Sequence, residues 1–298
     1  MRYVTYAQHG LEYPGLLHER TLYDLNEALG QTGQTAVPSL RALIEAAAEN
    51  PKILTALQAV DFGKCAPVEN ATLCAPIPRP ARNIFCLGKN YAAHATEVKE
   101  TRLSATGIPQ TPIYFTKTAS PALPAEGVID CPLELTQKLD YEAELAVVIG
   151  KAGKNIPAAD AESYIFGYTI LNDISARDLQ AKHEQWFRGK NLDTFCPMGP
   201  VLVDKSELPF PVNVQVTCRV NGEVRQNANT STLIFDIPTI LSDLSHGYTL
   251  LPGDIISTGT PAGVGAGFDP PRFLQDGDVV ECEIEQIGIL RNIVRRTV

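Results

Sequence analysis

Short apolar stretches separated by turns run along most of the chain, and their pattern predicts a β-rich fold. Residues 145–149 (LAVVI) and 168–171 (YTIL) are predominantly apolar, which is typical of strands buried on both faces. Residues 279–285 (VVECEIE) instead alternate apolar and acidic positions, which predicts a strand with one buried and one solvated face. The glutamates of that last strand are therefore interpreted as surface residues.

Turn signals divide the second half of the chain into further short elements. Residues 212–226 (VNVQVTCRVNGEVRQ) predict a hairpin, because an Asn-Gly pair at its centre suits a type I′ turn. A helix is predicted from Pro238, with Asp236 as its cap and Gly247 as its stop. Many strands and few long helices favour an α+β, β-rich architecture with a mixed or antiparallel sheet over a doubly wound one.

The first part of the chain has a different character. Residues 1–7 (MRYVTYA) predict a strand, and residues 37–60 predict one or two short helices broken at Pro51. A proline-rich passage follows (CAPIPRPARN) and indicates a boundary. We therefore expect a small α/β N-terminal domain over residues 1–75 and a larger domain over residues 76–298.

Composition and charge narrow the class of protein. The 298 residues are 44% hydrophobic and 20% charged, with a net charge of -9, which argues against a nucleic-acid or anionic-membrane partner. Seven scattered cysteines without a CxxC pair indicate reduced thiols. The N-terminus has no apolar signal-peptide core. We therefore expect a cytoplasmic protein.

Three acids precede the first apolar stretch, in the sequence LDYEAELAVVIG. Asp140, Glu142 and Glu144 are spaced by two, so in a strand they would share one face. Because the following residues are apolar on both faces, these like charges should raise one another's pKa or require a cation. The alternative is an exposed entrance to the strand. Other segments of the sequence are needed to decide between a functional acid cluster and an exposed strand entrance.

A further acid ends the second apolar stretch. The stretch Tyr168–Leu171 ends at Asn172 and Asp173, and with Glu142 and Glu144, Asp173 would complete an all-oxygen set. Such a set suits Mg²⁺ or Mn²⁺ and does not suit zinc, which prefers His and Cys. The alternative is that Asp173 caps a helix that begins near Ser175.

Candidate acid–base and cationic residues lie in two other segments. His94 and Glu97 are three apart on a predicted helix and so can hydrogen-bond, which would orient the imidazole to activate water. The alternative is a surface pair. Lys190 lies in a loop between apolar segments, where a lone lysine is more often solvated. The glycines after Thr260 miss the GxGxxG spacing, so a dinucleotide site is not expected.

Six segments, taken in order, resemble the fumarylacetoacetate hydrolase family. They are GKNYAAHATE, DYEAELAVVIG, GYTILNDISARDLQ, WFRGKNLDTFCPMGP, VNGEVRQNANTSTLIFDI and LPGDIISTGTPAGVG. The resemblance runs from about Asn83 to the C-terminus. It implies a mixed β-sandwich roll around a metal ion, usually paired as a homodimer, with the first 75 residues as the variable N-terminal domain of bacterial-type members.

The resemblance also implies roles for matching residues. The metal ligands would be Glu142, Glu144 and Asp173, for Mg²⁺ or Mn²⁺, with Ca²⁺ as a substitute in crystals. The catalytic residues would be His94, Glu97 and Lys190, and the substrate contacts would be Arg177, Gln180 and Thr260. Lys89 occupies a position that varies between subfamilies, so its role is left open.

The implied activity is metal-dependent C–C bond hydrolysis of acylpyruvate-like 2,4-dioxo acids such as fumarylpyruvate, in aromatic-compound catabolism. Water activated by His94 and Glu97 would attack the C4 carbonyl, and the metal would stabilise the departing enolate. Two alternatives stay open on the same site: oxaloacetate decarboxylation or tautomerisation, and isomerisation of 2-hydroxyhepta-2,4-diene-1,7-dioate. A third alternative is a non-catalytic protein stabilised by metal.

Overall fold

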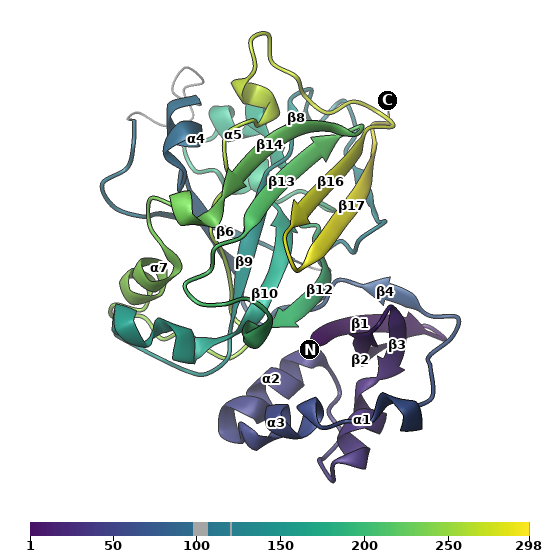
Figure 1. Ribbon diagram of the computed structural model, residues 1–298. Coiled ribbons are helices and arrows are strands. Elements are labelled where there is room, and N and C mark those ends of the chain that lie inside the picture. Colours follow the sequence, from purple (N-terminus) through teal and green to yellow (C-terminus); the bar gives the residue numbers. More distant parts are fainter. Residues whose placement is uncertain (98–106, 120, 298) are drawn as a thin grey trace.

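The computed structural model describes residues 1–97, 107–119 and 121–297 and places them in two packed sheets flanked by short helices (Figure 1). The strands are β1 (Arg2–Gln8), β2 (Leu11–His18), β3 (Thr21–Asp24), β4 (Thr72–Cys74), β5 (Ile84–Gly88), β6 (Ile113–Lys117), β7 (Val128–Asp130), β8 (Leu139–Asp140), β9 (Ala143–Ile149), β10 (Ile165–Asn172), β11 (Ser175–Ala176), β12 (Met198–Asp204), β13 (Gln215–Val220), β14 (Glu223–Asn229), β15 (Ile255–Ser257), β16 (Val279–Ile284) and β17 (Gly288–Arg295). The α-helices are α1 (Leu25–Gln31), α2 (Leu40–Glu49), α3 (Lys52–Gln58), α4 (Ala92–Glu97), α5 (Arg177–Lys182), α6 (Phe187–Lys190) and α7 (Ile237–Leu244).

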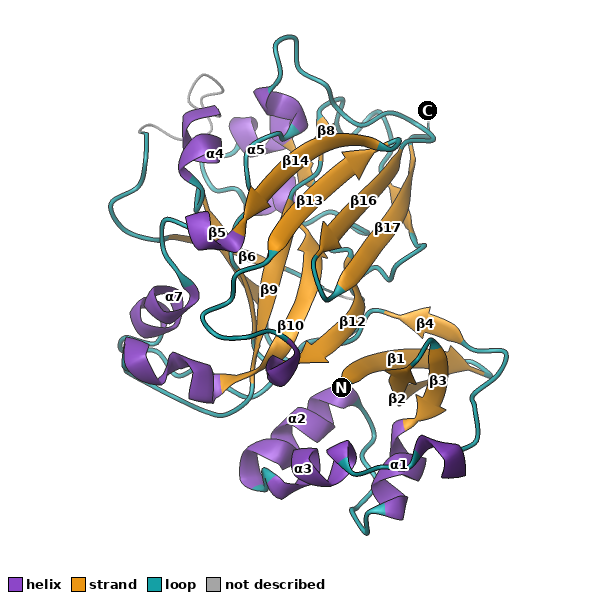
Figure 2. Ribbon diagram, viewed as in Figure 1, coloured by secondary structure: helices purple, strands orange, loops and turns teal. Residues whose placement is uncertain are grey.

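The larger sheet has the strand order β3-β2-β1-β12-β10-β9-β15-β5-β6, with β4 on β1. A five-stranded sheet, β14-β13-β16-β17-β7, lies over part of it (Figure 2). Most neighbours are antiparallel, and the β15–β5 and β17–β7 pairs are parallel. The β-rich, mixed-sheet α+β fold predicted from the sequence is therefore confirmed.

The central strand β9 is buried on both sides, as its uninterrupted apolar run predicts. Leu145, Val147 and Ile149 belong to the core shared with the five-stranded sheet. Ala146 and Val148 belong to a second core, which includes apolar residues of α1, α2 and α3. In β16, by contrast, only alternate residues are buried, as expected for a strand with one solvated face.

The N-terminal residues extend the large sheet. In β1, Tyr3 pairs with Leu202 of β12, and α2 and α3 separate at Pro51 as predicted. The division into domains at residue 75 stays a prediction.

Other local predictions are also met. Asn221 and Gly222 both have positive φ angles, 53° and 79°, in the predicted hairpin turn, and Asp236 caps α7 by accepting a bond from Thr239 N. All seven cysteines are free. Across the described residues, no helix combines the length and the apolar character needed to span a bilayer.

Candidate active site

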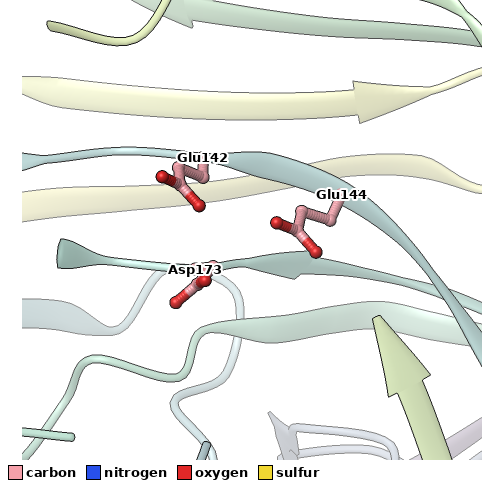
Figure 3. A group of neighbouring side chains, drawn as sticks. All are labelled: Glu142, Glu144 and Asp173. Carbon is pink, nitrogen blue, oxygen red and sulfur yellow. The ribbon is translucent and has the colours of Figure 1, made fainter. Parts of the chain in front are cut away.

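The start of β9 and the end of β10 meet at one edge of the core. Because these strands are antiparallel, Glu144 lies opposite Leu171, two residues before Asp173. Asp173 N donates a bond of 2.8 Å to Glu142 O. The carboxylates of Glu142, Glu144 and Asp173 lie with one ligand atom of each within 4.8 Å of the others (Figure 3). We call these three residues the carboxylate trio.

The carboxylate trio is buried, and two cationic residues, Lys190 and Arg177, partly neutralise it. The exposed fractions are 5% for Glu142, 1% for Glu144 and 0% for Asp173. Lys190 Nζ lies 2.9 Å from Glu142 Oε2 and 2.7 Å from Asp173 Oδ2. Arg177 Nη2 lies 2.7 Å from Glu142 Oε1. The expectation of a solvated lysine does not hold for Lys190, which is 2% exposed.

Glu144 has a different environment from the other two acids. Its Oε2 accepts bonds from the Ser257 hydroxyl and from Gly259 N, both of which are neutral donors. Burial raises the pKa of Glu144 well above its usual value, and the charges of Asp173 and Glu142 raise it further. Burial also raises the pKa of Glu142, but Lys190 and Arg177 outweigh it and the net shift is downward.

The trio fits a divalent cation. Its donors are carboxylate oxygens, the type that Mg²⁺ and Mn²⁺ prefer. Burial, together with the repulsion from Asp173 and Glu142, raises the pKa of Glu144, and a cation beside it would offset both effects. Asp173 does not cap a helix, because α5 begins only at Arg177 and Ala176 precedes it without a side-chain cap.

His94 and Glu97 form a pair on α4, in which His94 is buried and Glu97 is partly buried. His94 Nδ1 lies 3.2 Å from Glu97 Oε2, and the exposed fraction of His94 is 5%. Glu97 Oε1 accepts a bond of 2.8 Å from Gly263 N, which ties the helix to the glycine-rich loop after β15. The surface-pair alternative is therefore wrong. The later part of the predicted helix, residues 98–100, lies outside the described residues.

Seven of the nine residues singled out in the sequence line one cavity: His94, Glu142, Glu144, Arg177, Gln180, Lys190 and Thr260. The other two, Glu97 and Asp173, contact His94 and Lys190. The cavity has a volume of about 30 Å³.

The hydroxyl of Thr260 is engaged within the protein. It donates to Ala143 O at 3.0 Å and accepts from Gln226 Nε2 at 2.8 Å. Lys89, whose role the sequence leaves open, also lines the cavity, with a positive φ of 56°. On the cavity's apolar side, Trp186 packs edge-on against Phe115 with ring centroids 5.3 Å apart.

Two buried residues of the site were missed or misplaced by sequence reasoning. Lys117, at the end of β6, is fully buried and lies 2.8 Å from Asp173 Oδ1. An apolar strand ending in lysine was the only signal for it. Asp140 is in phase with Glu142 and Glu144 but is not part of the trio. The strand is interrupted there, because β8 pairs with β11 whereas β9 pairs with β10.

Comparisons with known proteins agree with this geometry. Residues 83–295 match the model of the fumarylacetoacetate (FAA) hydrolase C-terminal family. The chain is 52% identical over 220 residues to oxaloacetate tautomerase YisK of Bacillus subtilis, covering 74% of this chain and 72% of that one. A solved fumarylacetoacetate hydrolase from Exiguobacterium antarcticum is 39% identical, covers 99% of both chains and gives a TM-score of 0.84. A probable 2-hydroxyhepta-2,4-diene-1,7-dioate isomerase from Mycobacterium abscessus is 31% identical, covers 100% of both chains and gives a TM-score of 0.78.

Proposed function

Because this chain belongs to the fumarylacetoacetate hydrolase family, we propose that it is a divalent-metal-dependent tautomerase of a short 2-oxo dicarboxylic acid, with oxaloacetate as the simplest substrate. The observation that carries the proposal is that His94, held by Glu97, lines the same cavity as Glu142 and Glu144. A proton carrier and an anionic metal site thus face one small space. The 52% identity to a protein named as an oxaloacetate tautomerase supports this choice among the family's reactions.

The carboxylate trio would hold Mg²⁺ or Mn²⁺. A bound ion supplies a Lewis acid that stabilises negative charge developing on a 2-oxo acid. Arg177 and Lys190, which already neutralise Glu142, add positive charge on the cavity wall for the carboxylates of the substrate.

In the proposed reaction His94 transfers the proton. Its Nδ1 is directed at Glu97, so Nε2 is the nitrogen left for the substrate. In the keto-to-enol direction, a proton leaves C3 for Nε2 while the C2–C3 double bond forms, and the keto oxygen then receives a proton. The reverse sequence converts the enol to the keto form. No atom is gained or lost, and a positioned acid–base group of this kind typically contributes about 10²- to 10⁴-fold to the rate.

Hydrolysis of acylpyruvates such as fumarylpyruvate is the second candidate. The same His94–Glu97 contact of 3.2 Å is suited to activating water, and the similarity to the Exiguobacterium hydrolase supports it. The two reactions differ in whether water attacks a carbonyl carbon. Comparing a substrate that can only tautomerise with a substrate that water can also cleave therefore distinguishes the two reactions.

The direct test mixes freshly dissolved enol-oxaloacetate with the full-length protein, in Mg²⁺ and in EDTA. Loss of enol absorbance is followed together with trapping of the keto form by malate dehydrogenase and NADH. We expect Mg²⁺-dependent acceleration without pyruvate release. In His94→Ala we expect the acceleration to fall about 100-fold or more. His246→Ala, at an exposed turn after α7, serves as the matched control and should keep the wild-type rate.

Parallel incubations with fumarylpyruvate and acetylpyruvate decide the alternative. Rapid pyruvate release from these compounds, with no effect on enol-oxaloacetate, would replace the proposal by the hydrolase. Pyruvate release from oxaloacetate itself would indicate decarboxylation. No acceleration with any of the three substrates, together with metal-dependent stabilisation, would indicate a non-catalytic metal-binding protein.

A further inference from the structure

Asp140 is the third acid of the DYEAE segment, and the proposed reaction gives it no role. It is fully buried. Its Oδ1 accepts bonds from Tyr141 N (3.0 Å) and Gly265 N (2.6 Å). Its Oδ2 accepts bonds from Ala266 N (3.0 Å) and Arg177 Nε (2.8 Å). Both oxygens are thus held by two donors each, so the carboxylate is fixed in one orientation and is not shared with the trio.

One of these contacts leads to the carboxylate trio. Arg177 is 5% exposed, and its guanidinium reaches Asp140 through Nε and Glu142 Oε1 through Nη2, the latter at 2.7 Å. Because the guanidinium is planar and rigid, fixing Nε also fixes the direction of Nη2. The position of Asp140 therefore limits where the Glu142 carboxylate can lie.

The other contacts lead to the proton-transfer pair. Gly263 N binds Glu97 Oε1, whereas the amides of Gly265 and Ala266 bind Asp140. One short loop is therefore held between two carboxylates. A Cβ at Gly265 would lie 2.7 Å from Asp140 Oδ1 and 2.5 Å from Arg272 O, and a Cβ at Gly267 would overlap the Glu97 carboxylate. Such close approach requires glycine at both positions.

We propose that Asp140 is a positioning residue that fixes the carboxylate trio and the His94–Glu97 pair relative to each other. Through Arg177 it sets the orientation of Glu142, and through the loop of residues 263–267 it sets the orientation of Glu97, and so of His94. This inference rests on the proposed function, because it assumes that the trio binds metal and that His94 transfers the proton. In this arrangement Asp140 touches neither the metal nor the substrate, but metal binding and turnover both depend on it.

The test is Asp140→Asn in the full-length protein. The amide keeps the shape of the carboxylate, but its NH₂ group must face two N–H donors whichever way it is turned, so two hydrogen bonds are lost. Mn²⁺ affinity is measured by electron paramagnetic resonance titration, independently of turnover. Enol-oxaloacetate turnover and the melting temperature are measured on the same samples. We expect Mn²⁺ affinity and turnover each to fall roughly 10- to 100-fold, as for other residues that orient metal ligands.

Two further variants separate positioning from general destabilisation. Gly265→Ala disturbs the same contact from the loop side, because its Cβ would lie 2.7 Å from Asp140 Oδ1, so turnover and Mn²⁺ affinity should fall together, as in Asp140→Asn. Asp254→Asn changes another buried acid, which binds Arg82, at the far end of β15 from Ser257. It should lower the melting temperature and change neither Mn²⁺ affinity nor turnover.

The outcomes discriminate clearly. Wild-type Mn²⁺ affinity in a folded Asp140→Asn protein would overturn the link to Glu142. Equal losses in Asp254→Asn would overturn positioning in favour of plain destabilisation. If Asp140→Asn does not fold, Arg177→Lys decides, because lysine lacks the rigid planar guanidinium that links the orientations of the two acids, and unchanged Mn²⁺ affinity in it overturns the inference. Mn²⁺ binding by the wild type without turnover of oxaloacetate would contradict only the proposed function, and failure to bind Mn²⁺ would overturn both.

Discussion

The Lys117 ammonium lies 2.8 Å from Asp173 Oδ1, while Lys190 lies 2.7 Å from Oδ2 of the same carboxylate. Lys117 also donates to Ile174 O at 3.1 Å and to Lys190 O at 2.6 Å. It is fully buried, so its charge is shielded from water and is neutralised by the protein alone. A lysine 56 positions before Asp173 in the sequence thus joins β6, the segment after β10 and the end of α6.

Replacing this residue, as Lys117→Met, should have two opposite effects. In EDTA the variant should lose about 3 kcal/mol or more of unfolding free energy, since breaking a buried ion pair leaves an uncompensated charge. Without the positive charge of Lys117 the carboxylate trio is less neutralised, so the rise in melting temperature on adding Mg²⁺ should be larger than in the wild type. Thermal melts with and without Mg²⁺ measure both. Lys154→Met, at an exposed position, is the control, and an unchanged melt in Lys117→Met would contradict the assignment.

Glu144 gives a prediction about pH and metal. Because burial and the neighbouring acids raise its pKa above 4.5 in the folded state, folding favours its protonated form. In EDTA this group therefore removes stability as the pH rises from about 4.5 through the raised pKa. Saturating Mg²⁺ should abolish that loss. In Glu144→Gln the same pH-dependent loss should be absent, and the Mg²⁺-induced stabilisation, about 2.7 kcal/mol at a hundredfold excess over Kd, should disappear. A full Mg²⁺ shift in Glu144→Gln would remove this residue from the ligand set.

Much of the candidate site could be predicted from local sequence. The two-residue spacing of Glu142 and Glu144 before an apolar run, and Asp173 at the end of another, place all three acids at strand ends, and antiparallel pairing brings those ends together. The resemblance to the fumarylacetoacetate hydrolase family is confirmed over residues 83–295. The sequence does not determine whether the protein is a hydrolase, because the same side chains are compatible with hydrolysis and with tautomerisation.

The remaining contacts depend on the three-dimensional arrangement. Lys117 meets Asp173 only in the folded structure, where β6 is the edge strand of the large sheet, and the apolar residues before it in IYFTK do not show which acid it contacts. Asp140, in phase with Glu142 and Glu144, lies outside the trio, and the strand partner changes from β11 to β10 between Asp140 and Ala143. Arg177 lines the cavity and also contacts Glu142 and Asp140, and its predicted contact with the substrate stays a prediction.

Gly267 provides a test of the proton-transfer pair that leaves the carboxylate trio untouched. A Cβ at this position would overlap the Glu97 carboxylate, so Gly267→Ala must displace Glu97 and release His94 from its contact. We expect turnover to fall about 100-fold, the lower range for loss of an acid–base group, with unchanged Mn²⁺ affinity. Gly30→Ala, on α1 with open space around it, is the control and should be neutral or slightly stabilising. A wild-type rate in Gly267→Ala would show that the Glu97 contact is not needed for proton transfer.

Trp186, the single tryptophan of the chain, makes substrate binding directly observable. Its ring lies so close to Gly88 that a Cβ there would overlap it, and both residues line the cavity with Glu142 and Lys190. Because the ring forms part of the cavity wall, an anion bound there should change its environment and its fluorescence. Oxalate, which resembles the enolate of a 2-oxo acid, should change the emission in Mg²⁺ but not in EDTA, and the Mg²⁺ response should be lost in Glu144→Gln. An equal change in EDTA would show that the anion binds to the cationic side chains alone, without a metal at the trio.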